Sequence, residues 1–588
     1  MTTKKFRHRA RVGVTALLAV TALVACTSSD GSSDDSGSNG SDESVGLPLS
    51  ADDAVVQPSD ERGGTLRGLL QSDCDSWDPS RTYYHNCWNM QRWIYRTVMT
   101  FASEPGEPGG QPVPDLAEAP GEPSNDFQTW TYRLQSGLTY ENGQPITSAD
   151  IKYAIERTYA TDVISGGPVY FQTLLKNEQG YTGPYNGTQP QGLESIETPD
   201  DRTLVFQLNQ PFQDFDYVMA LPPSTPVPRD ADTGDQYGLA PVSSGPYKID
   251  SYVPGQSMHL VRNPEWSEET DPNRAALPDD IDIQMGLNPN DIDQRILAGQ
   301  ADVALDQLGV QSAALATLQS DEELRDAQTI TALSGRIRYI SVFTTNPPFD
   351  NEACRQAIAW AVDKRALQFA NNGGKIVDTM LNTGNADYTE FDLFPTEGNT
   401  GDPEKAREAL AECGYPDGFE TTIIARTQPK EEASAVALQA TLREIGIEAS
   451  VETFDPSVYF GSVMGVPANI EEGGYGMGFA SSLPDFYTGY GQLSSTIWGA
   501  SIVEKGNSNY ASLDDPIIND AFDAALSADS PEEAKEQWEI ADRRSAESGA
   551  YIPFIEEQVT LLVSEQTTNA YFSRGMGGLD VVSLGVAP

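Results

Sequence analysis

The chain has 588 residues and a formal net charge of −50, from 87 acidic and 37 basic side chains. Because a single hydrophobic core stops growing at roughly 250–300 residues, a chain of this length is expected to form two or three lobes. The acidic excess argues against nucleic-acid binding, which requires a basic surface, and against adhesion to anionic lipid; it serves general solvation or, alternatively, favours cationic ligands.

The first 25 residues predict an export signal. A basic run from Lys4 to Arg11 precedes 14 apolar or small residues, Val12 to Ala25, fewer than the about 20 that span a bilayer core. The end of this segment, Leu23-Val24-Ala25-Cys26, resembles the lipobox of bacterial lipoproteins, in which the cysteine is lipidated and becomes the new N-terminus. The alternative is a plain signal peptide with a cysteine after its cleavage site.

Residues 26–61 are expected to be the lipidated Cys26 and a disordered tether. Residues 27–45 are dominated by Gly, Ser and Asp, and such a composition cannot bury enough apolar surface to fold. No later apolar run approaches transmembrane length. We therefore expect a soluble body on the extracytoplasmic face of the cell membrane, held there only by its lipid.

The folded body is expected to begin at residue 63. Residues 63–70 predict a strand, and an aromatic stretch from Tyr83 predicts a helix. This helix either faces the core or lines a cleft with Tyr83, Tyr84 and Trp88, because aromatic rings with polar groups suit both positions. A second helix is expected after the capping box Thr147–Asp150. Further elements are expected at 127–140, 203–208, 244–249, 257–262, 281–285 and 301–305 (strands) and near 291–297 (helix).

The second half of the chain alternates between predicted strands and helices, which is typical of an α/β lobe. Strands are expected at 338–343, 419–425, 447–454, 551–554 and 560–563. Helices are expected at 351–369, 402–413, 431–445, 516–526 and 531–547. The segment Gly473–Trp498 carries few regular signals, and a loop of that length is usually functional or mobile.

Four cysteines remain once Cys26 is set aside. In an exported protein Cys74, Cys87, Cys354 and Cys413 indicate two disulfides. Three pairings are possible. We favour Cys74–Cys87 and Cys354–Cys413, which would stabilise the fold by about 3 and 4 kcal/mol. The alternative is that some of these thiols are free and buried.

Recognisable catalytic and metal-binding motifs are missing from the sequence. Of the three histidines, His8 lies in the signal, and His85 and His259 alone cannot form a three-histidine zinc site. No nucleophile elbow, P-loop or dinucleotide fingerprint occurs. We expect no catalytic residue, metal or cofactor, although carboxylates are so numerous that a two-carboxylate hydrolase stays open.

Four groups of short motifs follow one another along the chain. They are Thr131-Tyr132-Arg133-Leu134 with Gly143 to Ile151, Ser244-Gly245-Pro246-Tyr247 with Arg262-Asn263-Pro264, Pro348 to Lys364, and Asp402 to Tyr415. In this order and after a lipobox, they resemble the peptide-binding receptors of ABC importers, extracellular solute-binding family 5. The resemblance covers nearly all of the body.

The resemblance implies a three-lobed, periplasmic-binding-protein-like α/β fold, with two α/β lobes and a smaller inserted α+β lobe. The implied lobes are lobe I at 62–100, 236–335 and 549–588, lobe II at 101–235, and lobe III at 336–548. Ligand is buried between lobes I and III. The lobes close by bending at hinge strands expected near Arg338–Phe343 and Glu547–Pro553.

Peptide receptors of this family bind an extended peptide through main-chain hydrogen bonds, with roomy, wet pockets for its side chains. In many members an aspartate followed by an aromatic residue pairs with the peptide α-ammonium, and Asp485-Phe486 is the best match. Such a pair would select a free N-terminus. The expected ligand contacts are Asp485, Phe486, Tyr487, Phe479, Tyr84, Asn346 and Trp498. Alternatively Ser482 takes the anchor position, or Asp485 only caps its loop.

The resemblance therefore implies a receptor, not an enzyme, that delivers a peptide or other small solute to an ABC permease and its ATPase. We expect a monomer that binds no nucleic acid and meets the membrane only through its lipid. Members of the family also bind nickel chelates, sugars, opines or signalling peptides, so the solute stays open. The alternatives are a secreted lipoprotein hydrolase and a sensory or surface lipoprotein without a transport role.

Overall fold

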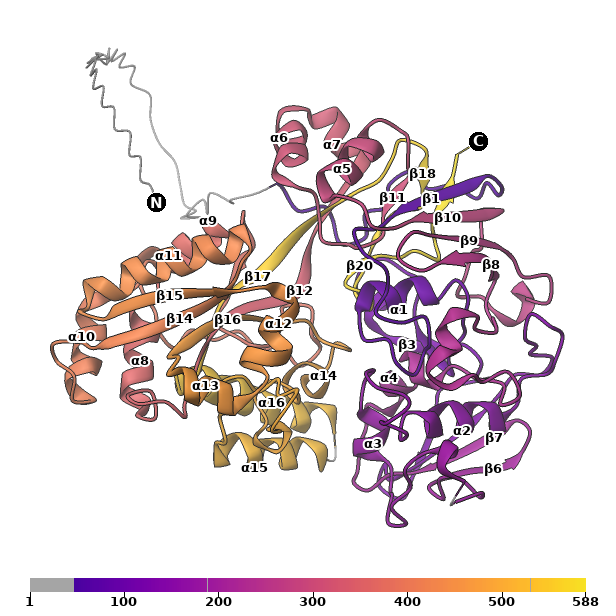
Figure 1. Cartoon of the computed structure of the whole chain (residues 1–588), viewed down its shortest axis with the longest axis horizontal. Helices are drawn as coiled ribbons and strands as arrows, with labels where there is room; N and C mark the ends of the chain where they lie inside the picture. Colours follow the sequence, from indigo (N-terminus) through magenta and orange to yellow (C-terminus); the bar gives the residue numbers. More distant parts are fainter. Residues whose placement is uncertain (1–46, 188, 529, 588) are drawn as a thin grey trace, which may run out of the picture. The chain divides into compact units, whose positions relative to one another are not determined.

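The computed structural model describes residues 47–187, 189–528 and 530–587 (Figure 1). The predicted signal, the predicted lipidation site Cys26 and most of the predicted tether lie outside these residues. The described part is an α/β protein whose main sheets have five, six and four strands. Among its described helices, none has the length and apolar character needed to cross a membrane.

The five-stranded sheet brings together distant parts of the chain, in the order β11-β1-β10-β9-β8. Strand β1 runs parallel to β10 and β11, and the other pairs are antiparallel. Its strands are β1 Thr65–Leu69, β8 Tyr247–Val253, β9 Ser257–Arg262, β10 Asp280–Gln284 and β11 Val303–Ala304. Nearby helices are α1 His85–Gln91, α5 Pro289–Leu297, α6 Ser312–Ser320 and α7 Glu322–Gln328.

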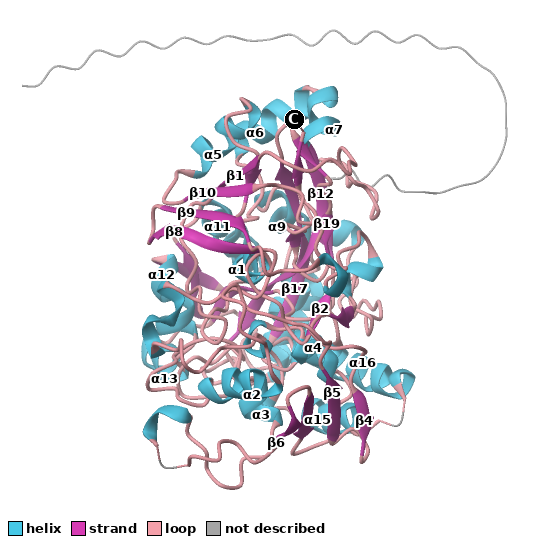
Figure 2. Cartoon of the chain, turned by 90° about the vertical axis from the view of Figure 1, so that its right-hand side faces the viewer, coloured by secondary structure: helices cyan, strands magenta, loops and turns pink. Residues whose placement is uncertain are grey.

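The four-stranded antiparallel sheet has the order β4-β5-β7-β6. Figure 1 shows this sheet on the same side of the molecule as the five-stranded sheet, with the five-stranded sheet at the top and this sheet at the bottom. Figure 2 shows the same order from another side. Its strands are β4 Glu122–Ser124, β5 Thr129–Arg133, β6 Ile196–Asp200 and β7 Thr203–Gln207. The helices of this part of the chain are α2 Ser148–Arg157, α3 Tyr170–Leu174 and α4 Phe215–Met219. Helix α2 begins with the predicted capping box, in which the Thr147 N–H donates to the Asp150 carboxylate at 2.8 Å.

The six-stranded sheet has the order β13-β17-β12-β16-β14-β15. Its strands are β12 Thr329–Val342, β13 Lys375–Ile376, β14 Glu420–Arg426, β15 Glu448–Phe454, β16 Met477–Ser482 and β17 Tyr551–Leu562. The main helices of this part are α8 Glu352–Ala361, α9 Lys364–Ala370, α10 Pro403–Glu412, α11 Pro429–Glu444, α13 Pro467–Gly473, α14 Gly489–Leu493, α15 Pro516–Leu526 and α16 Pro531–Glu547.

Strands β12 and β17 are long, with 14 and 12 residues. One end of β12 pairs with β16 inside the six-stranded sheet. Directly after β17, Val563 forms a bridge to Val303 of β11 in the five-stranded sheet. These two strands therefore join the two large sheets (Figure 1). The segments predicted as hinges, Arg338–Phe343 and Glu547–Pro553, overlap the ends of β12 and β17 that lie in the six-stranded sheet, and their role in closure stays a prediction.

Both favoured disulfides are present, which confirms the predicted pairing. Cys74–Cys87 ties the loop after β1 to α1, with Cα atoms 5.7 Å apart. Cys354–Cys413 joins α8 to the end of α10, with Cα atoms 5.4 Å apart. Each bond closes a loop whose opening would give the unfolded chain more conformational freedom.

Three expected elements differ from the structure. The single helix expected at 351–369 is two helices, because Val362 adopts an extended conformation and the Asp363 side chain caps α9 by accepting the Ala366 N–H at 2.8 Å. The segment expected to be largely irregular contains β16, which is buried on both faces and so lacks alternation. The two final strands expected at 551–554 and 560–563 are one strand, β17.

The first described residues form a segment that we call the strap, residues 47–59. Its Ser50 N–H donates to the Thr331 carbonyl of β12 at 2.8 Å, and the Leu47 carbonyl accepts from the Gln558 side chain of β17 at 2.7 Å. Val56 bridges to Ala570. The sequence predicts a disordered tether as far as residue 61, but these contacts hold its last part against the strands that join the two sheets.

Candidate ligand-binding site

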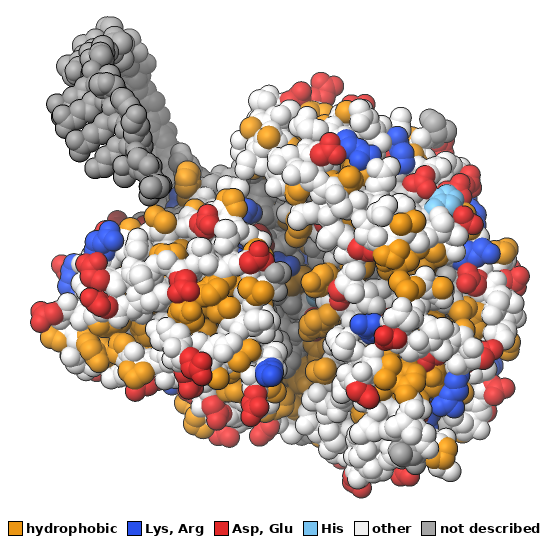
Figure 3. All heavy atoms as spheres, in the orientation of Figure 1, with side chains coloured by type: hydrophobic (Ala, Val, Ile, Leu, Met, Phe, Trp, Pro, Cys, Tyr) orange, Lys and Arg blue, Asp and Glu red, His pale blue; other side chains and the backbone are white. Residues whose placement is uncertain are grey.

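A cavity of about 560 Å³ lies between the two halves of the molecule, within the size range of small-molecule sites. One wall comes from Tyr83–Asn86 and Asp306–Leu308, and Arg336 and Tyr339 of β12 lie between the walls. The other wall is formed by Arg426, Ser481–Leu483, Asp485, Ser508 and Tyr510. Figure 3 shows the surface hollowed along this line. We call this cavity the cleft.

Asp485 lies in the loop between β16 and α14, and its carboxylate meets side chains from the opposite wall. The hydroxyls of Tyr83 and Tyr170 donate to Oδ2 at 3.0 and 2.7 Å. The Nε2 atom of His85 lies 3.4 Å from Oδ1. Asp485 is 9% exposed, so these contacts form in a water-poor environment that strengthens them.

Two of these three side chains, Tyr170 and His85, are themselves held in place by neighbouring rings. The Tyr170 ring packs against Phe486, with centroids 5.4 Å apart, and the His85 ring lies over Trp88 at 4.6 Å. Burial, and secondly the Asp485 charge, raise the pKa of Tyr170 well above its ordinary value. Its hydroxyl therefore remains a hydrogen-bond donor at any physiological pH.

The opposite charge in the cleft comes from Arg336. The register of β12 against β17 shifts between Leu333 and Ile337, and Gly335 inside this bulge has φ +77°, which favours glycine. The Arg336 guanidinium makes only long contacts, 3.4 Å to Ser481 Oγ and 3.5 Å to Glu557 Oε2. A guanidinium has five N–H donors, so Arg336 retains donors for a ligand.

The other arginines near this wall each form a close pair with a carboxylate. Arg338 lies 2.8 Å from Glu557, and Arg426 donates through Nε to Glu431 at 2.8 Å. Burial alone would raise the pKa of Glu557, but the charges of Arg338, Lys430 and Arg336 lower it to about 2. Arg336 is therefore the arginine of this group that is best placed to meet a bound anion.

Of the seven residues predicted to contact ligand, Asp485 and Tyr84 line the cleft. Phe486 is buried and stacks with Tyr217, with centroids 5.4 Å apart. Tyr487 faces a different cavity on the other side of β12. These two residues follow Asp485 directly, but the turn of the chain into α14 carries them away from the cleft.

The remaining three predicted contacts have structural roles outside the cleft lining. Phe479 is a core residue of β16 packed against Phe554. The Asn346 amide donates to the carbonyls of Ile470 and Tyr475 at 2.9 and 2.7 Å. Trp498 stacks on Phe522, with centroids 5.1 Å apart. Their aromatic or amide character suggested binding, but the same character serves packing and loop bonding here.

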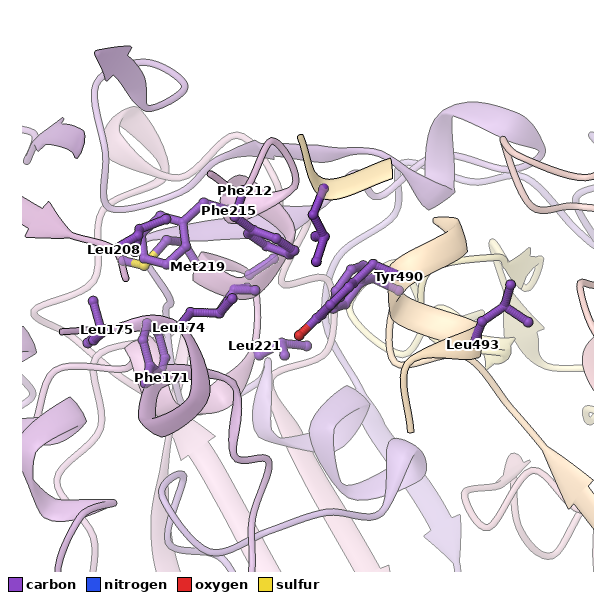
Figure 4. Packing of buried hydrophobic residues seen from close by; sticks show 14 of the residues in the cluster. Phe171, Leu174, Leu175, Leu208, Phe212, Phe215, Met219, Leu221, Tyr490 and Leu493 are labelled. Carbon is purple, nitrogen blue, oxygen red and sulfur yellow. The ribbon is translucent and has the colours of Figure 1, made fainter. Parts of the chain in front are cut away.

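Helix α14, which follows Asp485, packs on residues of the predicted lobe II (101–235). Figure 4 shows Tyr490 reaching from α14 toward Phe212 and Leu221, and the Tyr490 and Phe212 rings lie edge to face at 4.8 Å. Gln213 donates to the Ala528 carbonyl at 2.7 Å. These contacts join the two walls below the cleft.

Sequence reasoning missed Tyr170, His85 and Arg336 as functional residues. Tyr170 stands in a short helix without any local signal that would link it to Asp485, 315 residues away. His85 was singled out only because histidine is scarce. Arg336 directly follows Gly335, shortly before the strand expected at 338–343, and a glycine within a strand pattern can indicate a bulge, although no bulge was predicted there.

The chain matches the family model described as bacterial extracellular solute-binding proteins, family 5 Middle, over residues 111–499. It is 25% identical over 466 residues to the glutathione-binding protein GsiB of Escherichia coli (strain K12), covering 77% of this chain and 82% of that protein. The solved structure of clavulanic acid biosynthesis oligopeptide binding protein 2 is 39% identical, with a TM-score of 0.89, covering 91% of this chain and 98% of that one.

A more distant solved structure shares the fold. It is the periplasmic binding protein DppA from Helicobacter pylori in complex with peptide STSA, which is 18% identical with a TM-score of 0.69 and covers 90% of this chain and 99% of that one.

Proposed function

Because the chain belongs to the bacterial extracellular solute-binding proteins of family 5, the substrate receptors of ABC importers, we propose that it captures a peptide in the cleft and delivers it to a membrane permease and its ATPase. The similarity at 39% identity to a protein named as oligopeptide-binding supports a peptide as the solute. We further propose that lobe I and lobe III close over the peptide by bending at β12 and β17.

The observation that carries this proposal is a pair of opposite charges facing one cavity. Asp485 and Arg336 both line the cleft. The hydroxyls of Tyr83 and Tyr170 donate to Oδ2 of Asp485. Oδ1 has only the longer contact to His85 among these side chains, at 3.4 Å, and we propose that it also accepts from a ligand ammonium. A free peptide has an α-ammonium at one end and an α-carboxylate at the other, and each forms charge-assisted hydrogen bonds. An unblocked peptide therefore complements both charges.

Replacement of Asp485 by alanine tests the ammonium contact. For peptides with a free N-terminus we expect Asp485→Ala to weaken binding about ten- to hundredfold, because a hydrogen bond between charged groups contributes roughly 1.5–3 kcal/mol. Matched N-acetylated peptides, which lack the ammonium, serve as the control and should bind the two proteins alike. Titration calorimetry measures both. An equal loss for acetylated and free peptides would remove Asp485 from its proposed role.

Recovery of the bound peptide separates a receptor from a hydrolase. A receptor binds its ligand stoichiometrically and returns it unchanged, whereas an enzyme consumes it. We expect mass spectrometry to recover an added peptide intact after long incubation with the protein. Cleavage products in proportion to the protein present would favour the two-carboxylate hydrolase instead.

The proposed lipid anchor rests on the Leu23-Val24-Ala25-Cys26 sequence. A cysteine whose thiol carries the lipid cannot be replaced by serine without losing the anchor. We therefore expect Cys26→Ser to move the protein from the membrane fraction to the soluble fraction in cell fractionation. Continued sedimentation of the variant with membranes, after a wash with high salt, would exclude the anchor.

A further inference from the structure

A second cavity, of about 290 Å³, lies behind β12 and β17 and apart from the cleft. We call it the rear cavity. It is lined by strap residues 49–52, by Ile330–Leu333 of β12, by the turn Asn382–Gly384, and by Tyr487, Glu556 and Arg574. Its volume is close to the lower end of small-molecule sites.

The pleat of β17 separates the two cavities. Successive side chains of a strand point to opposite faces. Glu557 pairs with Arg336 and Arg338 on the cleft side, so Glu556 faces the rear cavity, which it lines. A ligand in the rear cavity therefore does not compete for the charges that face the cleft.

Glu556 is an unusual residue to find on an inner strand, because it is 2% exposed and buried carboxylates need partners. The N–H and the hydroxyl of Thr383 donate to it at 3.1 and 2.7 Å, and both bonds end on Oε2. The lone pairs of Oε1 remain for a donor inside the rear cavity. Burial raises the pKa of Glu556, and an added cationic partner would reverse that shift.

A positive charge borders the same turn from the other side. A side chain at Gly384 would meet Nη1 of Arg574 at 3.5 Å, so the guanidinium lies next to the residue that follows Thr383. Arg574 also pairs with Asp52 of the strap, a largely exposed residue. The rear cavity thus has a buried carboxylate within and a guanidinium near its mouth.

We propose that the rear cavity is a second binding site, which takes a small zwitterion with its cationic nitrogen at Glu556 and its carboxylate at Arg574. A free amino acid is the simplest solute of this class. The polar wall formed by Thr383, Asn382 and Tyr487 completes the hydrogen bonding that such a solute needs.

Occupation of this site would be linked to the cleft. The walls of the rear cavity come from the predicted lobe III, through Asn382–Gly384 and Tyr487, and from the predicted lobe I, through Phe572 and Arg574. Bending at β12 and β17 would change the distance between these walls. A ligand that bridges them prefers one hinge angle, so by linkage the amino acid and the peptide change each other's affinity by the same factor.

Titration calorimetry with single free L-amino acids on the mature protein tests the site. We expect at least one to bind with 1:1 stoichiometry at millimolar concentration or below. Glu556→Gln keeps the shape of the side chain and an acceptor for Thr383, and should weaken this binding at least about tenfold through loss of the charge. The amide and the N-acetyl derivative of the same amino acid, each lacking one charge, should bind similarly weakly.

Two further variants decide between the cavities. Asp485→Ala disables the cleft charge and should leave amino-acid binding unchanged. Leu333 lines the rear cavity and pairs with Gln558, which lies on the same face of β17 as Glu556. Leu333→Trp therefore fills the rear cavity without removing a charge and should abolish amino-acid binding. Circular dichroism checks that each variant is folded. Absence of binding by any amino acid, or binding that Asp485→Ala abolishes and both Glu556→Gln and Leu333→Trp retain, would overturn the proposal. Unchanged peptide affinity at saturating amino acid would overturn the linkage.

Discussion

The Asp485 carboxylate is shared by side chains from separate segments of the chain. Tyr83 comes from the loop before α1, His85 from α1 itself, and Tyr170 from α3 in the inserted part. Two donors on Oδ2 hold the carboxylate in place, while Oδ1 has the longer contact of 3.4 Å to His85. The tyrosines are therefore expected to orient the acidic group that is proposed to receive the peptide ammonium.

Replacement of Tyr170 by phenylalanine tests this orientation. Tyr170→Phe keeps the ring that packs on Phe486 and removes only the hydroxyl. We expect affinity for free peptides to fall about three- to tenfold, since one hydrogen bond contributes roughly 0.5–1.5 kcal/mol, with no change for N-acetylated peptides. Tyr217→Phe, whose ring also stacks on Phe486, is the matched control. A rise in affinity would mean that the hydroxyl competes with the ligand instead.

At this scale, prediction from sequence reached single residues but not their partners. Asp485, which lines the cleft, was chosen because it is followed by an aromatic residue, as in the family motif, and its role in binding stays a prediction. Asn346 and Trp498 were chosen for their residue type alone, and both have structural roles. Tyr170 could not be predicted, because its link to Asp485 exists only after two segments 315 residues apart have folded together.

The pair β12 and β17 is the element that carries the charges around both cavities. On one face, Glu557 holds Arg338 at 2.8 Å and lies near Arg336 and Lys430. On the other face, Glu556 points into the rear cavity. Two acidic residues in a row are tolerated in a central strand because each face provides its own hydrogen-bond donors.

The pKa of Glu557 predicts how this strand pair responds to acid. Three cationic neighbours lower this pKa to about 2 from an ordinary 4.5, so the unfolded state takes up the proton first as the pH falls. The stabilisation is complete above pH 4.5 and is lost as the pH falls toward 2. We expect the free energy of unfolding of the wild type to fall over this window.

The variant Glu557→Gln isolates this contribution. It should be less stable than the wild type at pH 6, because its arginines lose their counter-charge, and the difference should shrink toward pH 2. Denaturant unfolding at pH 6 and pH 3 measures it. A difference that stays constant between these two pH values would show that Glu557 acts through packing rather than through charge.

Element prediction was most accurate where sequence carries local signals. The capping box at Thr147 and the helices that begin at Pro516 and Pro531 lie where expected. Strand β16 was missed because its glycine and serine residues, buried on both sides, give no alternation. Strand β17 was expected as two strands because Glu556, Glu557 and Gln558 look like a loop until their partners across the sheet are known.

At the scale of the whole molecule, a buried ion pair connects Arg157 of α2, in the predicted lobe II, to Asp78, in the predicted lobe I. The Arg157 guanidinium at the end of α2 donates to both oxygens of Asp78, at 2.6 and 2.8 Å, and lies 3.2 Å from Asp232. The side chains of Arg157 and Asp78 are fully buried. Removal of one partner would leave an uncompensated charge in the interior.

Arg157→Met is therefore expected to lower the free energy of unfolding by about 3–5 kcal/mol. The double variant Arg157→Met with Asp78→Leu should recover part of this loss, because Asp232 is then the one carboxylate of this cluster left without the Arg157 charge. The exposed pair Arg62–Glu268 provides the control, since Arg62→Met should change stability by less than about 1 kcal/mol. Equal effects of Arg62→Met and Arg157→Met in denaturant unfolding would contradict this account.

The α/β class and the family were within reach of the sequence, since short motifs persist along the chain. The buried ion pairs were not, because 87 acidic residues each look solvated until folding removes a few of them from water. The lobe boundaries also remain predictions, and β12 runs across the one expected between residues 335 and 336.

If the proposed lipid anchor holds the protein at one end, the strap has a mechanical consequence. Leu47 and Ser50 are bonded to β17 and β12, so a pull on the chain that reaches Leu47 would enter the body beside these strands. For a receptor that closes about β12 and β17, such a force has almost no lever arm about the axis of closure. Tension on the anchor would then favour neither the open nor the closed state of the cleft. Ligand affinity would therefore be independent of that tension.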